Sequence, residues 1–309
     1  MEINSQFMLR ALELAAKGEI GAHPNPMVGA VIVNSNGEII GEGFHETCGQ
    51  AHAEVNAVKA AGNADLTDST IYVTLEPCSH WGKTPPCAQL IIDRKIPRVV
   101  VGTIDPFAKV SGRGISMMRQ AGIEVEILEG EIAEKCREIN RRFFTAHTLQ
   151  RPYIALKWAQ TADGFVDHIR TSPTIPALKI STPESQIAMH RYRSTFDAIT
   201  CGTNTARLDR PRLDARLWPG GRNPKRIELH RGDLLPQLSE LYRQGITSLL
   251  VEGGPTLHKS FLDADIWDEI RVETGSITIN EGLKAPTLPC NCFTINESPS
   301  IKIIRHKKQ

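Results

Sequence analysis

A histidine, a glutamate and two cysteines in the first half of the chain have the residue types and spacing of a zinc centre. His52 and Glu54 stand two residues apart at the start of an expected helix, and Cys78 and Cys87 follow a β-branched segment. One imidazole and two thiolates suit Zn²⁺, and a three-ligand site leaves a fourth position for water. Zinc lowers the pKa of such a water, so that hydroxide is available near neutral pH. The pattern therefore predicts a catalytic metal site.

Glu54 is expected to move a proton from the attacking water to a ring nitrogen and a leaving amine. His-x-Glu followed by Pro-Cys and a second Cys is the arrangement of zinc deaminases, in which the glutamate is not a ligand. Eight residues separate the cysteines here, rather than the two of nucleic-acid deaminases, which predicts an inserted loop over 79–86. A structural zinc site, with His45, Cys48 or His80 as the fourth ligand, is the alternative.

Further polar residues of the first half are candidate substrate contacts. Asn25 stands between two prolines and is a rigid polar group suited to a hydroxyl or a base edge, with an ordinary turn as the alternative. His80 and Lys83 lie between the cysteines and suit a phosphate, although a solvated loop would look similar. Asp105 follows an apolar strand, where ligand crevices form in α/β folds.

The sequence around these residues alternates helical and strand patterns, which indicates an α/β fold. The apolar spacing predicts helices over 5–17, 52–61, 88–94, 114–121 and 131–145, and strands over 28–33, 38–43, 71–75, 98–103 and 123–128. The turn Asn34-Ser35-Asn36-Gly37 is expected to join the first two strands as a hairpin.

A second α/β unit begins near Arg151-Pro152. Strands are predicted over 153–157, 198–201 and 246–251, helices over 183–193, 235–244 and 255–262, and a loop over 209–224. The guanidinium groups of Arg193 and Arg216 suit a phosphate, with solvated charges as the alternative. Gly253-Gly254 precedes a helix whose N-terminal amides can hold a phosphate, with a plain turn as the alternative. The sequence has no Gly-x-Gly-x-x-Gly, so a Rossmann fold is not indicated.

Length and composition limit the class of protein. The 309 residues suffice for about two domains. The chain has 36 Lys and Arg against 35 Asp and Glu. It therefore lacks the net positive charge that is typical of proteins that bind a long nucleic acid. No membrane span or signal peptide is found, so no membrane partner is expected. Seven cysteines, an odd number, are expected to be reduced or metal-bound, which predicts a cytoplasmic protein.

These motifs together resemble the RibD family, the bifunctional deaminase–reductases of riboflavin biosynthesis. The resemblance rests on Pro24-Asn25-Pro26, His52-Ala53-Glu54-Val55, residues 74–80 and 82–87, Asp105-Pro106, Leu156-Lys157, Asp163-Gly164, Ile180-Ser181, Asp197-Ala198-Ile199, Gly202-Thr203 and Val251-Glu252-Gly253-Gly254. It implies a cytidine-deaminase-like three-layer α/β/α domain over 1–147 and a dihydrofolate-reductase-like α/β domain over 148–309. The first would use one Zn²⁺ to deaminate a phosphorylated pyrimidine, 2,5-diamino-6-(5-phosphoribosylamino)pyrimidin-4-one. The second would reduce the ribosyl group with NADPH, and a homodimer is expected.

The resemblance also implies roles for individual residues. His52, Cys78 and Cys87 would bind zinc, and Glu54 would carry the proton. The substrate would contact Asn25, His45, Lys83, Arg193, Leu213, Arg216 and Glu252. NADPH would contact Ala159, Thr205, Asp209, Gly254, Pro255 and Thr256.

The second half departs from the family pattern in three places. The family usually has a Ser-x-Trp motif just before the position of Ile180, whereas this chain has Ala177-Leu178-Lys179 there. Several dozen residues are missing between 227 and 235, and the chain ends before the family's final strand. If central strands are missing, the sheet is expected to have an exposed edge with unpaired backbone groups. Either a second copy covers this edge in a dimer, or the edge weakens the domain. Two alternatives follow: a deaminase whose second domain serves structure or dimerisation, and a nucleic-acid deaminase of the tRNA type.

Overall fold

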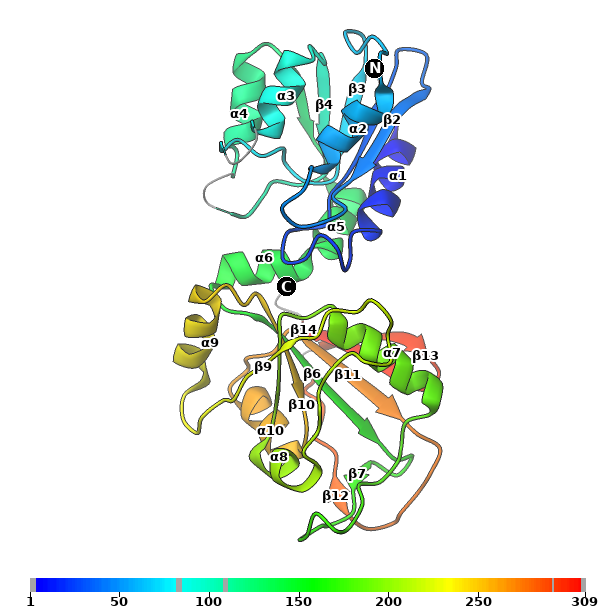
Figure 1. Cartoon of the computed structure of the whole chain (residues 1–309), viewed down its shortest axis with the longest axis vertical. Helices are drawn as coiled ribbons and strands as arrows, with labels where there is room; N and C mark the ends of the chain where they lie inside the picture. Colours follow the sequence, from blue (N-terminus) through cyan, green and yellow to red (C-terminus); the bar gives the residue numbers. More distant parts are fainter. Residues whose placement is uncertain (1–3, 82–84, 108–110, 291, 307–309) are drawn as a thin grey trace. The chain divides into compact units, whose positions relative to one another are not determined.

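The computed structural model describes residues 4–81, 85–107, 111–290 and 292–306, and the chain divides into two units, 1–149 and 150–309 (Figure 1). The boundary expected at 147 falls within the last helix of the first unit. No helix among the described residues is long and apolar enough to cross a membrane.

The first unit is a five-stranded sheet of order β2-β1-β3-β4-β5 with helices on both faces. Its strands are β1 (Gly29–Val33), β2 (Ile39–Phe44), β3 (Thr70–Val73), β4 (Arg98–Val101) and β5 (Glu124–Ile127), and its helices are α1 (Ser5–Ala16), α2 (Ala53–Ala61), α3 (Cys87–Asp93), α4 (Arg113–Gln120), α5 (Gly130–Ile139) and α6 (Arg141–Leu149). Alternate strand residues point to opposite faces. Ile32 and Val99 pack with α2, α3 and α4, whereas Val31 and Val100 pack with α1 and α5. The three-layer expectation is confirmed.

Helix α2 lies unusually close to β2, and this fixes the place of His52 and Glu54. A Cβ atom on Gly43 would lie 2.4 Å from the backbone nitrogen of Ala57 and 2.5 Å from the backbone oxygen of Ala53. Glycine at this position therefore lets the helix backbone pack directly on the strand. His52 is the N-cap of the helix, and Glu54 lies in its first turn.

The single long helix predicted over 131–145 is wrong, because Asn140 divides it into α5 and α6. The side chain of this buried residue accepts a hydrogen bond from the Met27 N–H and donates one to the Met27 carbonyl, both at 2.7 Å. Asparagine competes with helical backbone hydrogen bonds in this way. The break ties the start of α6 to the segment that carries Asn25.

The second unit contains a seven-stranded sheet of order β13-β14-β11-β6-β10-β8-β9 and a small β12-β7 pair. Its strands are β6 (Tyr153–Gln160), β7 (Phe165–Asp167), β8 (Ala198–Cys201), β9 (Lys225–Arg226), β10 (Ser248–Glu252), β11 (Glu269–Thr274), β12 (Leu283–Lys284), β13 (Cys292–Ser298) and β14 (Ile301–His306), and its helices are α7 (Pro183–Ser194), α8 (Thr203–Asp209), α9 (Leu234–Arg243) and α10 (Pro255–Asp263). Helices α9 and α10 pack on one face of the sheet and α7 on the other.

The expectation of missing central strands in this unit is wrong. Strands β11, β6, β10 and β8 form a continuous parallel core, and the last strand, β14, pairs with both β11 and β13. The shortening between 227 and 235 instead follows β9, an exposed edge strand of two residues. An edge can lose neighbouring strands without breaking the core, whereas a central strand cannot.

His258 gives this unit an acid-sensitive core. It is fully buried on α10, its Nε2 lies 3.1 Å from the Val251 carbonyl, and burial lowers its pKa to about 4. The unfolded chain takes up a proton below the ordinary histidine pKa of about 6.5, and the folded chain does so only near 4. The contribution of neutral His258 to the free energy of unfolding is therefore fully present above about pH 6.5 and is lost as the pH falls towards 4.

We expect His258 to reduce the free energy of unfolding by about 2 kcal/mol between pH 7.5 and pH 5. His258→Gln, which can still donate to the Val251 carbonyl, should lose less stability over this range. Urea unfolding followed by tryptophan fluorescence measures this, because Trp158 lies beside His258 with ring centroids 5.2 Å apart. His230→Gln, at an exposed position of the same unit, should match the wild type. Equal pH slopes for the wild type and His258→Gln would contradict the prediction.

Candidate active site

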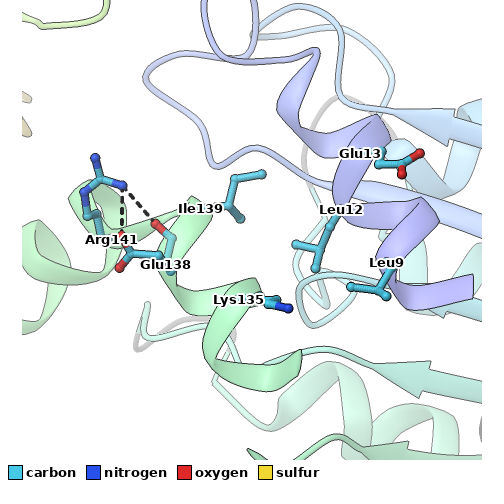
Figure 2. Close-up of a pocket in the computed structure, with 7 residues that line it drawn as sticks. All are labelled: Leu9, Leu12, Glu13, Lys135, Glu138, Ile139 and Arg141. Atoms are coloured by element: carbon cyan, nitrogen blue, oxygen red, sulfur yellow. Dashed lines mark hydrogen bonds and ion pairs between the residues drawn. The ribbon is translucent and has the colours of Figure 1, made fainter. Parts of the chain in front are cut away.

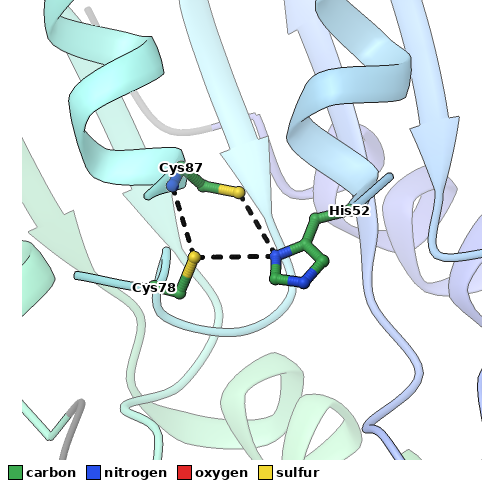
Figure 3. Close-up of side chains that lie close together, drawn as sticks. All are labelled: His52, Cys78 and Cys87. Carbon is green, nitrogen blue, oxygen red and sulfur yellow. Dashed lines mark hydrogen bonds between the residues drawn. The ribbon is translucent and has the colours of Figure 1, made fainter. Parts of the chain in front are cut away.

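The three predicted metal ligands converge in the first unit (Figure 3). His52 comes from the N-cap of α2, Cys78 from the loop after β3, and Cys87 from the first residue of α3. The His52 Nδ1 atom lies 3.6 Å from the Cys78 Sγ and 3.4 Å from the Cys87 Sγ. The Cys87 backbone N–H also donates to the Cys78 Sγ at 3.3 Å. Two helix N-termini thus face this group, and helix dipoles favour the negative charge of thiolates there.

This group fits Zn²⁺ in size and chemistry. Tetrahedral zinc with a Zn–N bond of about 2.0 Å and a Zn–S bond of about 2.3 Å separates nitrogen and sulfur by roughly 3.5 Å. The two observed separations, 3.4 and 3.6 Å, bracket that value. Hydrogen bonding with Cys87 and His52 lowers the pKa of the Cys78 thiol, which favours the thiolate that zinc binds. Within the described part of the chain no fourth His, Cys, Asp or Glu joins the group, so a four-ligand structural site gains no support.

Glu54 lies beside this group and is 3% exposed. Burial raises the pKa of its carboxyl group, while the nearby His52 opposes that shift. A carboxyl group whose pKa moves towards neutrality can both accept and donate a proton. The position and chemistry therefore suit the proton-carrying role expected of Glu54.

A pocket of about 330 Å³ opens onto these residues. Its lining consists of Asn25, Pro26, Val28, His45, His52, Glu54, Leu75, Glu76, Cys78, His80, Asp105, Phe107, Phe143 and His147. Asn25 and His45, both predicted substrate contacts, line this pocket, whereas Lys83 lies outside the described residues. The pocket also contains Phe107, Phe143 and His147, for which the sequence predicted no role. The only signal in the sequence was the four-residue spacing of Phe143 and His147.

His45 and Asn25 form a chain of hydrogen bonds with a defined direction. The Nδ1 atom of His45 lies 3.0 Å from the Ala51 carbonyl, which can only accept, so Nδ1 carries the proton. Burial lowers the pKa of His45, which favours the neutral ring. Its Nε2 then accepts from the Asn25 amide nitrogen at 3.2 Å. The backbone at Ala51 therefore sets the orientation of the Asn25 amide in the pocket.

Glu76 is a buried pocket residue that the sequence did not single out. Its carboxylate accepts backbone N–H groups from Asp105 at 3.3 Å, Gly112 at 2.9 Å, Gly114 at 3.0 Å and Ile115 at 3.4 Å. These bonds cover the start of α4 and hold the loop after β4 against the cysteine segment. The motif Glu-Pro-Cys could have drawn attention to it, but its four partners are at least 29 residues away.

A larger hollow, of about 520 Å³, lies between α1 and α5 (Figure 2). Leu9, Leu12 and Ile139 form its apolar part, and Glu138 pairs with Arg141 at 3.2 Å on its rim. It contains none of the candidate site residues. The chemistry of the first unit is therefore concentrated in the smaller pocket.

In the second unit the structure brings several predicted substrate residues together. Arg193 on α7 forms a paired ion bridge with Glu252 at the end of β10, with both N–O distances 2.7 Å. It also donates to the Asp214 carbonyl at 3.2 Å, next to Leu213. Arg216 is half-exposed and donates to the Asp214 carboxylate at 2.5 Å. Because Arg193 already contacts two protein acceptors, Arg216 is the more available cation.

The predicted NADPH residues end or follow parallel strands of the sheet: Ala159 is the second-last residue of β6, α8 follows β8, and the Gly253-Gly254 turn follows β10. Thr205 on α8 lies next to the Gly253-Gly254 turn, since a Cβ on Gly253 would lie 3.1 Å from its hydroxyl. Gly254 is the N-cap of α10, and the predicted contacts Pro255 and Thr256 form its first turn. Ala159 lies on β6, opposite Glu273 of β11.

Asp209 has a partner that the sequence did not reveal. It ends α8, and its carboxylate accepts from Arg170 at 2.6 Å. Arg170 also pairs with Asp167 at 2.6 Å and is almost fully buried. The partners lie 39 residues apart in the chain, and no local pattern links them.

A three-layer α/β/α unit with a His-Cys-Cys centre and a buried glutamate defines the class of zinc deaminases, here joined to a second α/β unit. Two family profiles agree: "Cytidine and deoxycytidylate deaminase zinc-binding region" over residues 1–103, and "RibD C-terminal domain" over 152–232 and 225–288. The two pieces of the second match meet where the sequence predicted missing residues.

The chain belongs to the RibD family of riboflavin biosynthesis proteins. It is 38% identical to the riboflavin biosynthesis protein RibD of Aquifex aeolicus, with 91% of this chain and 89% of that protein covered. That alignment spans 326 positions, more than the 309 residues of this chain, so the relative has residues that are absent here. RibD of Escherichia coli K12 is 33% identical, with 86% of each chain covered.

A crystal structure from Thermotoga maritima matches both units. It is described as a diaminohydroxyphosphoribosylaminopyrimidine deaminase/5-amino-6-(5-phosphoribosylamino)uracil reductase, and the match has a TM-score of 0.84 and 34% identity. It covers 97% of this chain and 98% of that one. The family resemblance and the fold expected for both domains are confirmed.

Proposed function

We propose that this chain is a two-step enzyme of riboflavin biosynthesis: a zinc-dependent deaminase followed by an NADPH-dependent reductase. The observation that carries the first step is the His52, Cys78 and Cys87 group with buried Glu54 at one pocket. The substrate of this step is 2,5-diamino-6-(5-phosphoribosylamino)pyrimidin-4-one. The relatives' names and the two family profiles support the same pair of activities.

In the deaminase step His52, Cys78 and Cys87 would hold Zn²⁺, and the chemistry that the metal would supply there is a Lewis acid that makes hydroxide available near neutral pH. Glu54 accepts the proton of the attacking water and passes it to the ring nitrogen and then to the leaving amino group. Asn25, oriented by His45, contacts the pyrimidine edge. The amino group leaves as ammonia, and a carbonyl oxygen takes its place.

In the second step the ribosyl group would be reduced to ribityl by a hydride, which bound NADPH would supply, and a proton, which would come from solvent. Arg216 contacts the substrate phosphate, and Arg193 orients Glu252 towards the same ligand. The backbone N–H groups of the first turn of α10, which start at Thr256 because Pro255 has none, would hold a cofactor phosphate at the helix N-terminus. The remaining cofactor contacts would come from two residues of α8, Thr205 and Asp209, and from Ala159 of β6.

NADPH binding separates this proposal from a deaminase with a purely structural second unit. At a concentration 100 times its dissociation constant, NADPH should stabilise the folded chain by about 2.7 kcal/mol, because it binds only the folded state. Thermal unfolding with and without NADPH measures this, alongside separate assays of ammonia release and NADPH oxidation. Ammonia release with neither a thermal shift nor NADPH oxidation at millimolar NADPH would contradict the reductase half. Release of ammonia from tRNA but not from the pyrimidine would favour the nucleic-acid alternative.

We further propose that the enzyme is cytoplasmic and forms a homodimer. None of the seven cysteines, each within the described residues, forms a disulfide, which fits a reducing compartment. The exposed edge strand β9 gives a second copy a place to cover unpaired backbone groups. Light scattering of the purified chain tests the dimer.

A further inference from the structure

Three aromatic side chains, Phe107, Phe143 and His147, line the deaminase pocket, and the His147 ring contacts both phenylalanines; we refer to the three as the aromatic wall. The ring centroids of Phe143 and His147 lie 4.4 Å apart at an interplanar angle of 65°, and those of Phe107 and His147 lie 5.1 Å apart at 63°. Phe143 and His147 are four residues apart on α6 and therefore share one helix face. Phe107 comes from the loop after β4. None of the three belongs to the metal group or to the proton-carrying machinery.

The aromatic wall lies nearer to solvent than the reacting groups do. Glu54 is 3% exposed and Cys87 2%, whereas each wall residue is only half-buried. The carbon that loses its amino group must reach the deep end, where Glu54 can exchange protons with it. The ribosylamino group stands on C6, across one ring nitrogen from the reacting C2, and points away from that carbon. This bulky substituent therefore extends towards the mouth of the pocket, where the wall lies.

The wall is fixed by the surrounding structure. Asn140 anchors the start of α6 to both backbone groups of Met27 at 2.7 Å. Glu76 accepts the Asp105 N–H, and the Asp105 carboxylate accepts the Phe107 N–H at 2.7 Å. A recognition surface that is ordered before the ligand arrives loses less entropy on binding.

We propose that the aromatic wall binds the ribosyl part of the substrate, an inference that rests on the deaminase function proposed above. The flat faces of Phe107 and Phe143 pack against the apolar side of the sugar. The His147 ring packs against both phenylalanines and completes this surface. Burial lowers the pKa of His147, which favours its neutral form over a cation that would suit a phosphate. The wall thereby makes the deaminase selective for a pyrimidine that carries a sugar.

The test compares Phe143→Leu with Phe144→Leu, since Phe144 is a half-buried neighbour on the same helix that does not line the pocket. Ammonia release is measured with the phosphoribosyl substrate and with 2,5,6-triaminopyrimidin-4-one, which lacks the ribosyl phosphate. Where the smaller compound is not turned over, its inhibition constant replaces the KM. Phe143→Leu should raise the KM for the phosphoribosyl substrate about tenfold, with kcat within about twofold and zinc content unchanged. Its affinity for the smaller compound and all constants of Phe144→Leu should stay at wild-type values.

His147 provides a second pair of variants at another position of the wall. His147→Phe keeps an aromatic ring against the two phenylalanines and should retain more affinity for the phosphoribosyl substrate than His147→Leu does. Equal losses with both compounds would mean that the wall contacts the base and would overturn the proposal, as would wild-type constants in every wall variant. A wild-type chain that releases no ammonia from the phosphoribosyl substrate would overturn the deaminase function and the wall together.

Discussion

Glu54→Gln is expected to lower the rate of ammonia release by about 10²–10⁴-fold while the chain keeps one zinc ion. Glutamine has nearly the same size, but its amide cannot take the proton of the attacking water or return it to the substrate. Because burial raises the pKa of the Glu54 carboxyl, a neutral amide at this position loses no favourable charge interaction with solvent. The fold should therefore be at least as stable as in the wild type.

Three measurements on the same preparation check the Glu54 prediction. Zinc is counted per chain, the thermal midpoint is recorded, and ammonia release is followed at saturating substrate. Glu134→Gln on α5 is the matched control, since its carboxylate is exposed and pairs with the exposed Arg137. A Glu54→Gln protein with full zinc and wild-type ammonia release would show that the proton follows another route. Loss of zinc would instead mean that Glu54 supports the ligand geometry.

The metal group could be predicted from sequence because its members stand in short motifs. His52 and Glu54 share one turn of helix, and the cysteines flank one loop, so local spacing places all four. The hairpin after β1 and the alternating elements of both units were predictable for the same reason. Patterns of 2 and 3.6 residues carry information about neighbours in the chain.

The rest of the pocket depends on contacts between distant segments. The pattern over 131–145 is helical throughout, and only the bonds from Asn140 to Met27, 113 residues away, show where the helix breaks. That break brings Phe143 and His147 to the pocket. In the same way, the shortening after residue 227 was visible in the sequence, but its place at the edge of the sheet followed only from the strand order.

Asp268→Asn is expected to destabilise the second unit by about 3–5 kcal/mol, because it leaves the Arg151 guanidinium buried without its counter-charge. Asp268 is fully buried, and its two carboxylate oxygens accept from Arg151 at 2.6 and 2.8 Å. One of those oxygens also accepts the Ile154 N–H at 2.6 Å. Asparagine supplies a single oxygen, so its NH₂ group must face a donor. The sequence predicts that the second unit begins near Arg151-Pro152, and in the structure this arginine is bonded to Asp268, the residue before β11, which also accepts the Ile154 N–H of β6.

The Asp268 variant should separate the two activities by temperature. For a unit of this size, the loss corresponds to a fall of roughly 10 °C in its melting temperature. NADPH oxidation should therefore fail well below the temperature at which ammonia release fails, since the zinc group lies in the other unit. Asp263→Asn is the control, because Asp263 is 61% exposed and its pair with Lys259 spans one helical turn, where such pairs contribute about 0.5 kcal/mol or less. If the second unit has the same melting temperature in Asp268→Asn as in Asp263→Asn, the Arg151–Asp268 pair is not what stabilises it. If both activities fail at one temperature, the two units unfold as one.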